Sequence, residues 1–190
     1  MRTIVVASGK GGTLKSSLVA SLGVYAASEA KTALIDLNAD QATLTRWWKA
    51  RGEPANPFLV EEIEGQLHHE LRALDKIKRV HCLIDTPPDE MKTIEVAVFD
   101  ATAVLIPVRA SELDIEASKA IVDMCQRRRK PYAFVLVAVD NRLAARELNK
   151  QARAELGKLG DSVLKAVWPY SVAAVQGMAK GKAGKNQTLG

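Results

Sequence analysis

Short runs of apolar residues without alternation constrain the fold of this chain more than any other feature. Strands that are apolar on both faces are typical of parallel sheets, because helices cover such sheets on both sides. The runs cover residues 3–8, 32–36, 80–85, 103–108 and 133–139, and a weaker sixth run covers 162–168. The sequence therefore predicts a central, mainly parallel sheet.

The segments between these runs have the apolar spacing of helices. The expected helices cover residues 15–29, 41–51, 61–74, 90–99, 112–128 and 143–157. Residues 52–57 contain two prolines and a glycine and are expected to form a loop. Alternation of strands and helices predicts a three-layer α/β fold, in which ligands bind beyond the carboxyl ends of the strands. We expect one domain over residues 1–179 and a mobile basic tail over 180–190.

A glycine-rich loop joins the first expected strand to the first expected helix. Its residues are Gly9, Lys10, Gly11, Gly12, Thr13, Leu14, Lys15, Ser16 and Ser17. Inward-pointing N–H groups and the positive end of the following helix suit such a loop to a phosphate chain. In the P-loop pattern G-x-x-x-x-G-K-[ST], the lysine reaches the β- and γ-phosphates and the serine hydroxyl binds Mg²⁺. Leu14 replaces the second glycine of that pattern, which predicts a differently bent loop or weaker phosphate binding.

Lys10 adds a second lysine to this loop, and the stretch KGGTLKSS resembles the deviant Walker A motif of the ParA/MinD family of ATPases. The resemblance continues along most of the chain. Residues 35–41 match the family's D-x-D-P-Q segment in part, and residues 83–88, LIDTPP, resemble its Walker B strand and switch. Residues 105–114 resemble the next strand and loop, and 169–177 resemble the C-terminal loop on the nucleotide side. The lack of an N-terminal helix-turn-helix extension is similar to the small ParA type of plasmid partition.

The resemblance implies a role for each matching residue. Lys10 is expected to reach the partner's phosphates across a nucleotide-sandwich homodimer, and Asp36 is expected to belong to the catalytic switch. Ser16 is expected to bind Mg²⁺ directly, and Asp85 through water. The residues expected to contact ATP are Gly9, Lys10, Gly11, Gly12, Thr13, Leu14, Lys15, Ser16, Ser17 and Pro169.

Two positions depart from the family pattern. Asn38 stands where the family has the aspartate that orients the attacking water, and an asparagine cannot take a proton. Phosphoryl transfer depends mainly on positioning and charge, so Asn38 stays a catalytic candidate beside Lys10 and Asp36, with slow hydrolysis expected. Asp40 is an alternative if the loop shifts. Ala138 takes the place of the family's adenine-binding asparagine, for which residues 140 and 141 are alternatives.

Positive charge is concentrated in the C-terminal part of the chain. Residues 1–120 carry 14 Lys/Arg and 17 Asp/Glu, whereas residues 121–190 carry 13 Lys/Arg and 5 Asp/Glu. Such an excess indicates an anionic partner or a solvated basic face. ATP-loaded ParA-like dimers bind DNA non-specifically, and the candidate residues are Arg127, Arg128, Arg129, Arg142, Arg146, Lys150 and Arg153. The first three are alternatively cations that complement a helix C-terminus.

The sequence also indicates where the protein works. Residues 180–190 lack the bulky apolar residues that a membrane-binding amphipathic helix needs, so we expect no membrane association. The chain has two cysteines and no signal-peptide pattern, which predicts a cytoplasmic protein. The DNA binding that the resemblance implies would place it at the nucleoid.

The function that the resemblance implies is a ParA-like ATPase that dimerises on ATP and Mg²⁺ and binds DNA non-specifically. Hydrolysis stimulated by a ParB-like adaptor would then drive plasmid partition. One alternative is an ATP-binding switch with little hydrolysis, which Leu14 and Asn38 suggest. A second is a positioning ATPase for a cargo other than DNA, such as a protein organelle or a chemoreceptor cluster. A small-molecule kinase would need a lid segment, for which the sequence shows no obvious candidate.

Overall fold

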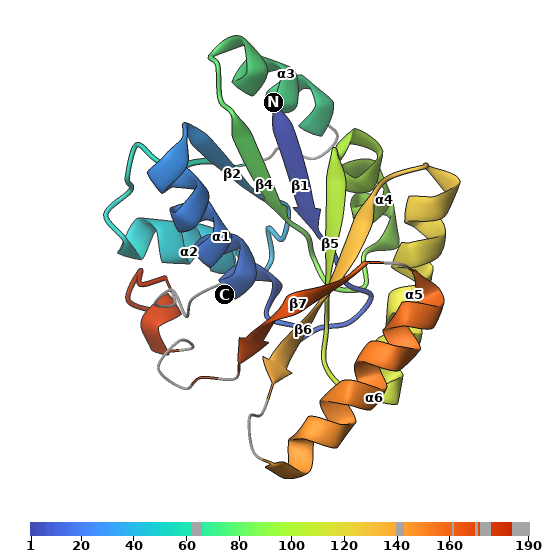
Figure 1. Ribbon diagram of the computed structural model, residues 1–190. Coiled ribbons are helices and arrows are strands. Elements are labelled where there is room, and N and C mark those ends of the chain that lie inside the picture. The colour runs from blue at the N-terminus through green and yellow to red at the C-terminus, as the bar shows by residue number, and fades with distance from the viewer. Residues whose placement is uncertain (62–65, 140–142, 161, 170, 172–175, 184–190) are drawn as a thin grey trace.

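A seven-stranded sheet forms the centre of the molecule in the computed structural model, which describes residues 1–61, 66–139, 143–160, 162–169, 171 and 176–183 (Figure 1). The strands are β1 (Arg2–Val6), β2 (Thr32–Asp36), β3 (Phe58–Glu61), β4 (His81–Asp85), β5 (Ala103–Val108), β6 (Tyr132–Val139) and β7 (Val163–Pro169). Their order is β3-β2-β4-β1-β5-β6-β7, and every neighbouring pair is parallel. The predicted α/β fold is therefore confirmed.

Helices cover both faces of the sheet, as the uninterrupted apolar runs of the strands require. The helices are α1 (Lys15–Glu29), α2 (Thr43–Ala50), α3 (Leu67–Lys76), α4 (Met91–Asp100), α5 (Glu112–Arg127) and α6 (Leu143–Leu159). One hydrophobic cluster joins the sheet to buried residues of α3, α4, α5 and α6, and a second joins the opposite face to α1 and α2. The result is three layers (Figure 1).

The segment between α2 and α3 differs from the sequence-based expectation. Residues 58–61 form the edge strand β3, which was not predicted, and α3 begins at Leu67 rather than at residue 61. A four-residue apolar run is too short for its spacing to separate a strand from a helix. Pairing with β2 decides the matter, because β2 would otherwise be the edge of the sheet.

The segment that was expected to begin a mobile tail is packed in its first residues. Trp47 Nε1 donates a hydrogen bond to the carbonyl of Lys182 at 3.1 Å, and Arg51 donates to the carbonyl of Gly181 at 3.0 Å. Met178 and Ala183 pack against the α1–α2 cluster. Residues 181–183 of the segment expected to be a mobile tail therefore contact the α2 region, and residues 184–190 lie outside the described part of the chain. The buried indole N–H of Trp47 and the guanidinium of Arg51 both need acceptors, and composition alone does not show which carbonyls supply them.

The carboxyl ends of the central strands bring the chemical groups together. Asp36 at the end of β2 and Val6 at the end of β1 both pair in register with Asp85 at the end of β4. The glycine-rich loop follows β1 directly, so it lies above both aspartates at one edge of the sheet. This is the edge at which ligands bind in parallel α/β folds.

Candidate functional site

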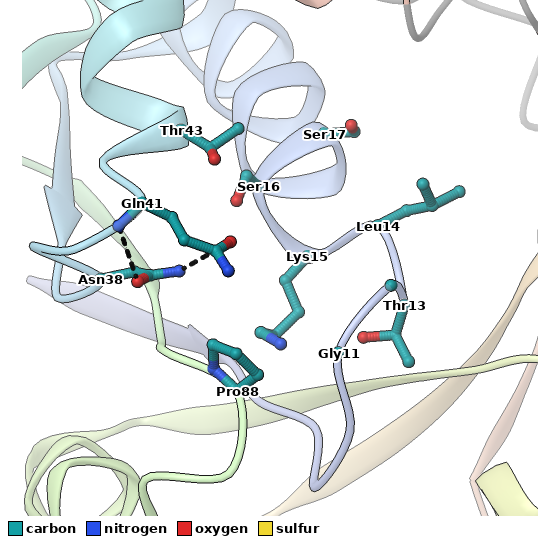
Figure 2. Close-up of a pocket in the computed structure, with 11 residues that line it drawn as sticks. Gly11, Thr13, Leu14, Lys15, Ser16, Ser17, Asn38, Gln41, Thr43 and Pro88 are labelled. Carbon is teal, nitrogen blue, oxygen red and sulfur yellow. Dashed lines mark hydrogen bonds between the residues drawn. The ribbon is translucent and has the colours of Figure 1, made fainter.

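The loop between β1 and α1 lines one side of a cavity of about 220 Å³ (Figure 2). The other side comes from the segment after β2 and from Pro88, which follows β4. The lining residues are Gly11, Gly12, Thr13, Leu14, Lys15, Ser16, Ser17, Asn38, Gln41, Thr43 and Pro88. The structure thus brings together most of the residues that the sequence assigned to the nucleotide.

Hydrogen bonds inside the loop fix its shape. The Ser8 hydroxyl donates to the carbonyl of Lys10 at 2.8 Å and bonds the Thr13 hydroxyl at 2.7 Å. Gly9 passes so close to α5 that a Cβ on it would lie 2.5 Å from the carbonyl oxygen of Ala117. Glycine at position 9 is therefore required by this contact and not by backbone freedom. The polar side chains of Ser8 and Thr13 therefore hold this loop in shape, and residues 8–15 are called the phosphate cup below.

Leu14 has the backbone conformation for which glycine is favoured. Its φ is 57° and its ψ is 27°, in the left-handed region, and it is the N-cap of α1. This conformation costs a non-glycine residue roughly 1–2 kcal/mol. The side chain packs against the cluster between α1 and α2, which offsets part of that cost. Position 14 thus has a left-handed backbone without a glycine, and both predicted consequences, a differently bent loop or weaker phosphate binding, stay predictions.

Lys15 lies at the floor of the cavity, with its side chain extending toward Pro88 and Gly11 (Figure 2). It is 7% exposed, and its ammonium donates a hydrogen bond to the Ser8 hydroxyl at 3.2 Å. Burial lowers the pKa of Lys15, whereas the nearby charges of Asp85 and Asp89 oppose that change. Within the described residues Ser8 is its one acceptor, so two N–H donors of this ammonium are available to a phosphate.

Asp85 is the buried acid of the site. It is 1% exposed, and among the described residues neither of its carboxylate oxygens has a hydrogen-bond partner. Burial raises the pKa of Asp85 to about 7; the nearby Ser16 hydroxyl and the Lys15 ammonium oppose the rise, and Asp36 adds to it. A buried unpaired carboxylate is costly unless a cation comes to it.

These groups fit Mg²⁺. A carboxylate without a partner lies next to the hydroxyl of Ser16, and oxygen ligands of this kind suit Mg²⁺, which keeps several waters and takes others from phosphates. No group of three or more His, Cys, Asp or Glu that could hold a metal is present among the described residues. Two oxygen ligands from the protein are typical of a metal site whose remaining ligands come from a nucleotide and water.

Asp36 is bound to the start of α2. Its Oδ2 accepts hydrogen bonds from the backbone N–H and the hydroxyl of Thr45, both at 2.9 Å, and its Oδ1 accepts from the N–H of Asn38 at 3.1 Å. The carboxylate therefore supplies the N-terminal cap that Ala42, the N-cap residue, cannot. In this arrangement Asp36 positions the 37–42 segment, and the catalytic role predicted for it stays a prediction.

Asn38 faces the loop across the cavity, but its amide is engaged. Its Nδ2 donates to the Gln41 side chain at 3.4 Å, and its Oδ1 accepts the Gln41 N–H at 3.3 Å (Figure 2). Neither the Gln41 side chain nor Thr43 was singled out from the sequence. The Gln41 contact fits the turn that Asn38 makes, since asparagine commonly bonds the backbone a few residues further on.

Other predicted residues lie away from the cavity. Pro169 ends β7 at the same edge of the sheet, three strands from β1, and is not among the lining residues. Ala138, at the adenine position, has φ of 54° beside an irregularity in the β6–β7 pairing. The alternatives at 140 and 141 lie outside the described residues.

The predicted DNA-binding residues form two separate groups. Arg127, Arg128 and Arg129 end α5, at the amino ends of the strands, whereas Arg146 and Lys150 are exposed near the start of α6. Helix α5 has 16 residues and is therefore about 24 Å long. The first group lies about that far from the start of α5, which is at the carboxyl ends of the strands. The two groups thus lie toward opposite ends of the strands, and DNA binding by either group stays a prediction.

Some of these cations are already engaged. Arg128 forms an ion pair with Glu95 at 3.0 Å and lies over the ring of Phe99. Arg153 donates to the carbonyls of Leu164 and Lys165 on the edge strand β7, at 2.6 and 2.9 Å. Arg142 lies outside the described residues. Among the described candidates on α6, Arg146 and Lys150 are the exposed cations.

This geometry defines a P-loop protein with a site for a nucleotide and its metal ion. Residues 4–183 match the family described as CbiA, the CobQ/CobB/MinD/ParA nucleotide binding domain. The chain belongs to this family. No described helix has the length and apolar character that a bilayer crossing requires.

Relatives within the family differ in cargo. The maintenance of carboxysome distribution protein A of Gloeobacter kilaueensis is 29% identical over 116 residues, 60% of this chain and 52% of that protein, so the chain matches about half of that relative. The fold is similar to apo McdA of Cyanothece, with a TM-score of 0.79 and 19% identity over 96% of this chain and 91% of that one. A plasmid partition protein of Borrelia burgdorferi bound to AMPPNP has a TM-score of 0.73 and 17% identity, covering 94% and 89%.

Proposed function

We propose that the chain is a positioning ATPase that closes into a homodimer around ATP and Mg²⁺ and distributes a protein assembly as its cargo. The observation that carries the proposal is the pair formed by a prebuilt phosphate cup and an unpartnered buried carboxylate beneath it. Both groups are paired, and the folded state is stabilised most, when a metal ion and a phosphate chain occupy the site together.

Different residues of the site bind the phosphates and the metal ion. Lys15 donates to phosphate oxygens from the floor, and Ser16 with Asp85 hold the metal ion, which neutralises phosphate charge when bound. Asn38 can orient a water with the remaining N–H or lone pair of its amide, but it cannot take a proton from that water. Hydrolysis is therefore expected to be slow in the absence of a stimulating partner.

Lys10 is the residue that the proposed dimer depends on. Its carbonyl accepts a hydrogen bond from the Ser8 hydroxyl inside the loop, which fixes the backbone at this point. Among the described residues, no acceptor bonds the Lys10 ammonium. A cation on this fixed backbone, outside the residues that line the cavity, is the candidate to reach the phosphates of a second subunit.

Lys10→Ala is expected to leave ATP binding within about threefold of the wild type and to abolish ATP-dependent dimerisation, because it removes a cation outside the cavity. Light scattering with size-exclusion chromatography in Mg²⁺ and a slowly hydrolysed ATP analogue measures the change in mass, and a titration measures affinity. Lys31→Ala, an exposed lysine at the opposite end of β2, is the matched control. A Lys10→Ala protein that dimerises like wild type would contradict the sandwich dimer.

A protein cargo is favoured over a plasmid by the relative that the chain matches in sequence, which is named for carboxysome distribution. The likeness to the Borrelia plasmid partition protein concerns the fold. In cells that lack the protein, a protein assembly is expected to lose its even spacing while plasmids are retained. Plasmid loss with normally spaced assemblies would reverse this assignment. An adaptor on the cargo, comparable to a ParB-like protein, is the proposed partner.

Non-specific DNA is the proposed surface over which the dimer moves, and Arg146 with Lys150 are the proposed contacts. Replacing both by alanine is expected to reduce the slope of log affinity against log salt by about 1.8, since each lost phosphate contact contributes about 0.9. Fluorescence anisotropy with duplexes of two unrelated sequences measures this slope. Arg128→Ala is the control, because Glu95 already neutralises that guanidinium. A slope unchanged in the double variant would place the DNA surface elsewhere.

An ATP-binding switch with little hydrolysis is the second candidate function. The amide at position 38 favours it, because an asparagine cannot take a proton from an attacking water and this side chain is held by Gln41. Phosphate release measured with DNA and the cargo adaptor present separates the two. Turnover at background under those conditions supports the switch, and partner-stimulated turnover supports the positioning ATPase.

A further inference from the structure

Arg109 approaches the phosphate cup from an element that the P-loop pattern does not include. It follows β5, which pairs with β1 on the side away from β4 and β2. A Cβ placed on Gly12 would lie 3.7 Å from NH1 of Arg109. The guanidinium is therefore next to the loop, on the side opposite to Asn38 and Gln41.

A buried carboxylate holds Arg109 in this place. Asp114, on the first turn of α5, is 5% exposed and accepts hydrogen bonds from Nε of Arg109 at 3.2 Å and from its NH2 at 3.0 Å. The Ser111 hydroxyl donates to the same carboxylate, and the backbone N–H of Asp114 donates to Ser111 at 3.2 Å. Asp114 is thus fixed by the N-cap of α5 before it binds Arg109.

This two-point attachment leaves one end of the guanidinium unused. The bonds to Asp114 take Nε and NH2, and no described residue accepts a hydrogen bond from NH1. The Arg109 side chain is 38% exposed, whereas that of Asp114 is 4% exposed. The buried carboxylate of Asp114 therefore holds the guanidinium of Arg109 from the interior, and the free N–H groups of Arg109 lie at the loop.

We propose that Arg109 donates hydrogen bonds through NH1 to the phosphate chain of a nucleotide bound in the same subunit, and that Asp114 is its positioning residue. Arginine carries N–H groups in a planar fork, so Asp114 can hold one side while the other side meets a phosphate oxygen. Because the geometry exists before any ligand arrives, little side-chain entropy remains to be lost on binding. The inference rests on the nucleotide site of the proposed function.

The test measures affinity and not turnover. The full chain carrying Lys10→Ala, which is expected to remain monomeric, is titrated with fluorescent ATP and ADP analogues in Mg²⁺. Arg109→Ala in this background is expected to weaken binding of the ATP analogue about ten- to hundredfold, as for a lost hydrogen bond between charged groups. Arg109→Lys is expected to recover little, since a lysine cannot bond Asp114 at two points and the phosphate at once. Asp114→Asn is expected to lie between wild type and Arg109→Ala.

Arg72→Ala, an exposed arginine of α3, is the matched control and is expected to bind as the parent does. Thermal unfolding without nucleotide shows whether each variant folds; if Arg109→Ala does not, Arg109→Gln takes its place. Unchanged affinity in a folded Arg109 variant would overturn the proposal. An effect seen only in the dimerising parent, and absent in the Lys10→Ala background, would also overturn it, by making Arg109 a contact to the other subunit. If Lys15→Ala leaves nucleotide binding intact, the proposed function itself fails, which keeps the two failures apart.

Discussion

Replacing Asp85 by asparagine is expected to make the nucleotide-free protein more stable at neutral pH while removing its response to Mg²⁺. The carboxylate is 1% exposed and without a hydrogen-bond partner among the described residues, so its ionised form destabilises the folded state. An amide of the same shape carries no charge to desolvate. The expected gain in the free energy of unfolding at pH 7.5 is on the order of a few kcal/mol.

The wild type should show the same effect as a dependence on pH. The pKa of Asp85 is raised from 3.8 to about 7 in the folded state, so the folded state holds a proton that the unfolded state releases between these values. The free energy of unfolding therefore falls as pH rises from about 4 to about 7 on account of this group, and Asp85→Asn removes that dependence. Urea unfolding of both proteins at pH 5 and pH 7.5, without nucleotide, measures the difference.

Mg²⁺ with ATP should reverse the order of the two proteins. A divalent cation near Asp85 stabilises its ionised form, so the wild type gains stability on binding and the asparagine variant gains much less. Asp123→Asn, an exposed aspartate on α5, is the control and is expected to follow the wild type in every condition. Equal stability of wild type and Asp85→Asn at pH 7.5 would contradict the destabilising role. An equal gain from Mg²⁺ would contradict the metal site.

Lys15→Ala is expected to abolish nucleotide binding, with the dissociation constant raised by about a hundredfold or more, because the variant leaves phosphate charge unpaired at the buried floor of the cup. The Lys15 ammonium has a lowered pKa and one hydrogen bond to Ser8, so the fold should tolerate its loss. Isothermal titration with ATP and Mg²⁺ measures affinity, and circular dichroism checks that the variant is folded. Lys31→Ala serves again as the control. ATP affinity unchanged in Lys15→Ala would refute the P-loop assignment.

The sheet could be predicted because its strands are apolar throughout, and parallel pairing is the arrangement that buries both faces. The edge strand β3 could not, because its four residues have no period of their own and pair only where β2 offers a free edge. The packing of Gly181 and Lys182 on α2 depends on where two donors, Trp47 and Arg51, happen to point. Contacts of this kind are set by tertiary structure and leave no local pattern.

For the site, motif spacing predicted the cup and its buried lysine but not the network around them. Motif spacing does not give distances in the folded protein. It therefore could not show that Asp85 lacks a hydrogen-bond partner or that Asn38 bonds Gln41. The sequence does contain a pattern that points to Arg109. Ser111 and Asp114 have the spacing of a capping box, which predicts a fixed carboxylate at the start of α5 and invites a search for the cation it holds.

The two ends of the described chain lie on different sides of the molecule, and this decides where a reporter can be attached. The ammonium of Met1 bonds Asp75 at 2.9 Å at the amino ends of the strands, an exposed pair whose loss costs little. Residues 181 and 182, by contrast, bond α2, whose first turn holds Asp36. A fluorescent protein fused before Met1 therefore lies away from α2, whereas one joined directly behind Ala183 lies next to the helix whose first turn holds Asp36.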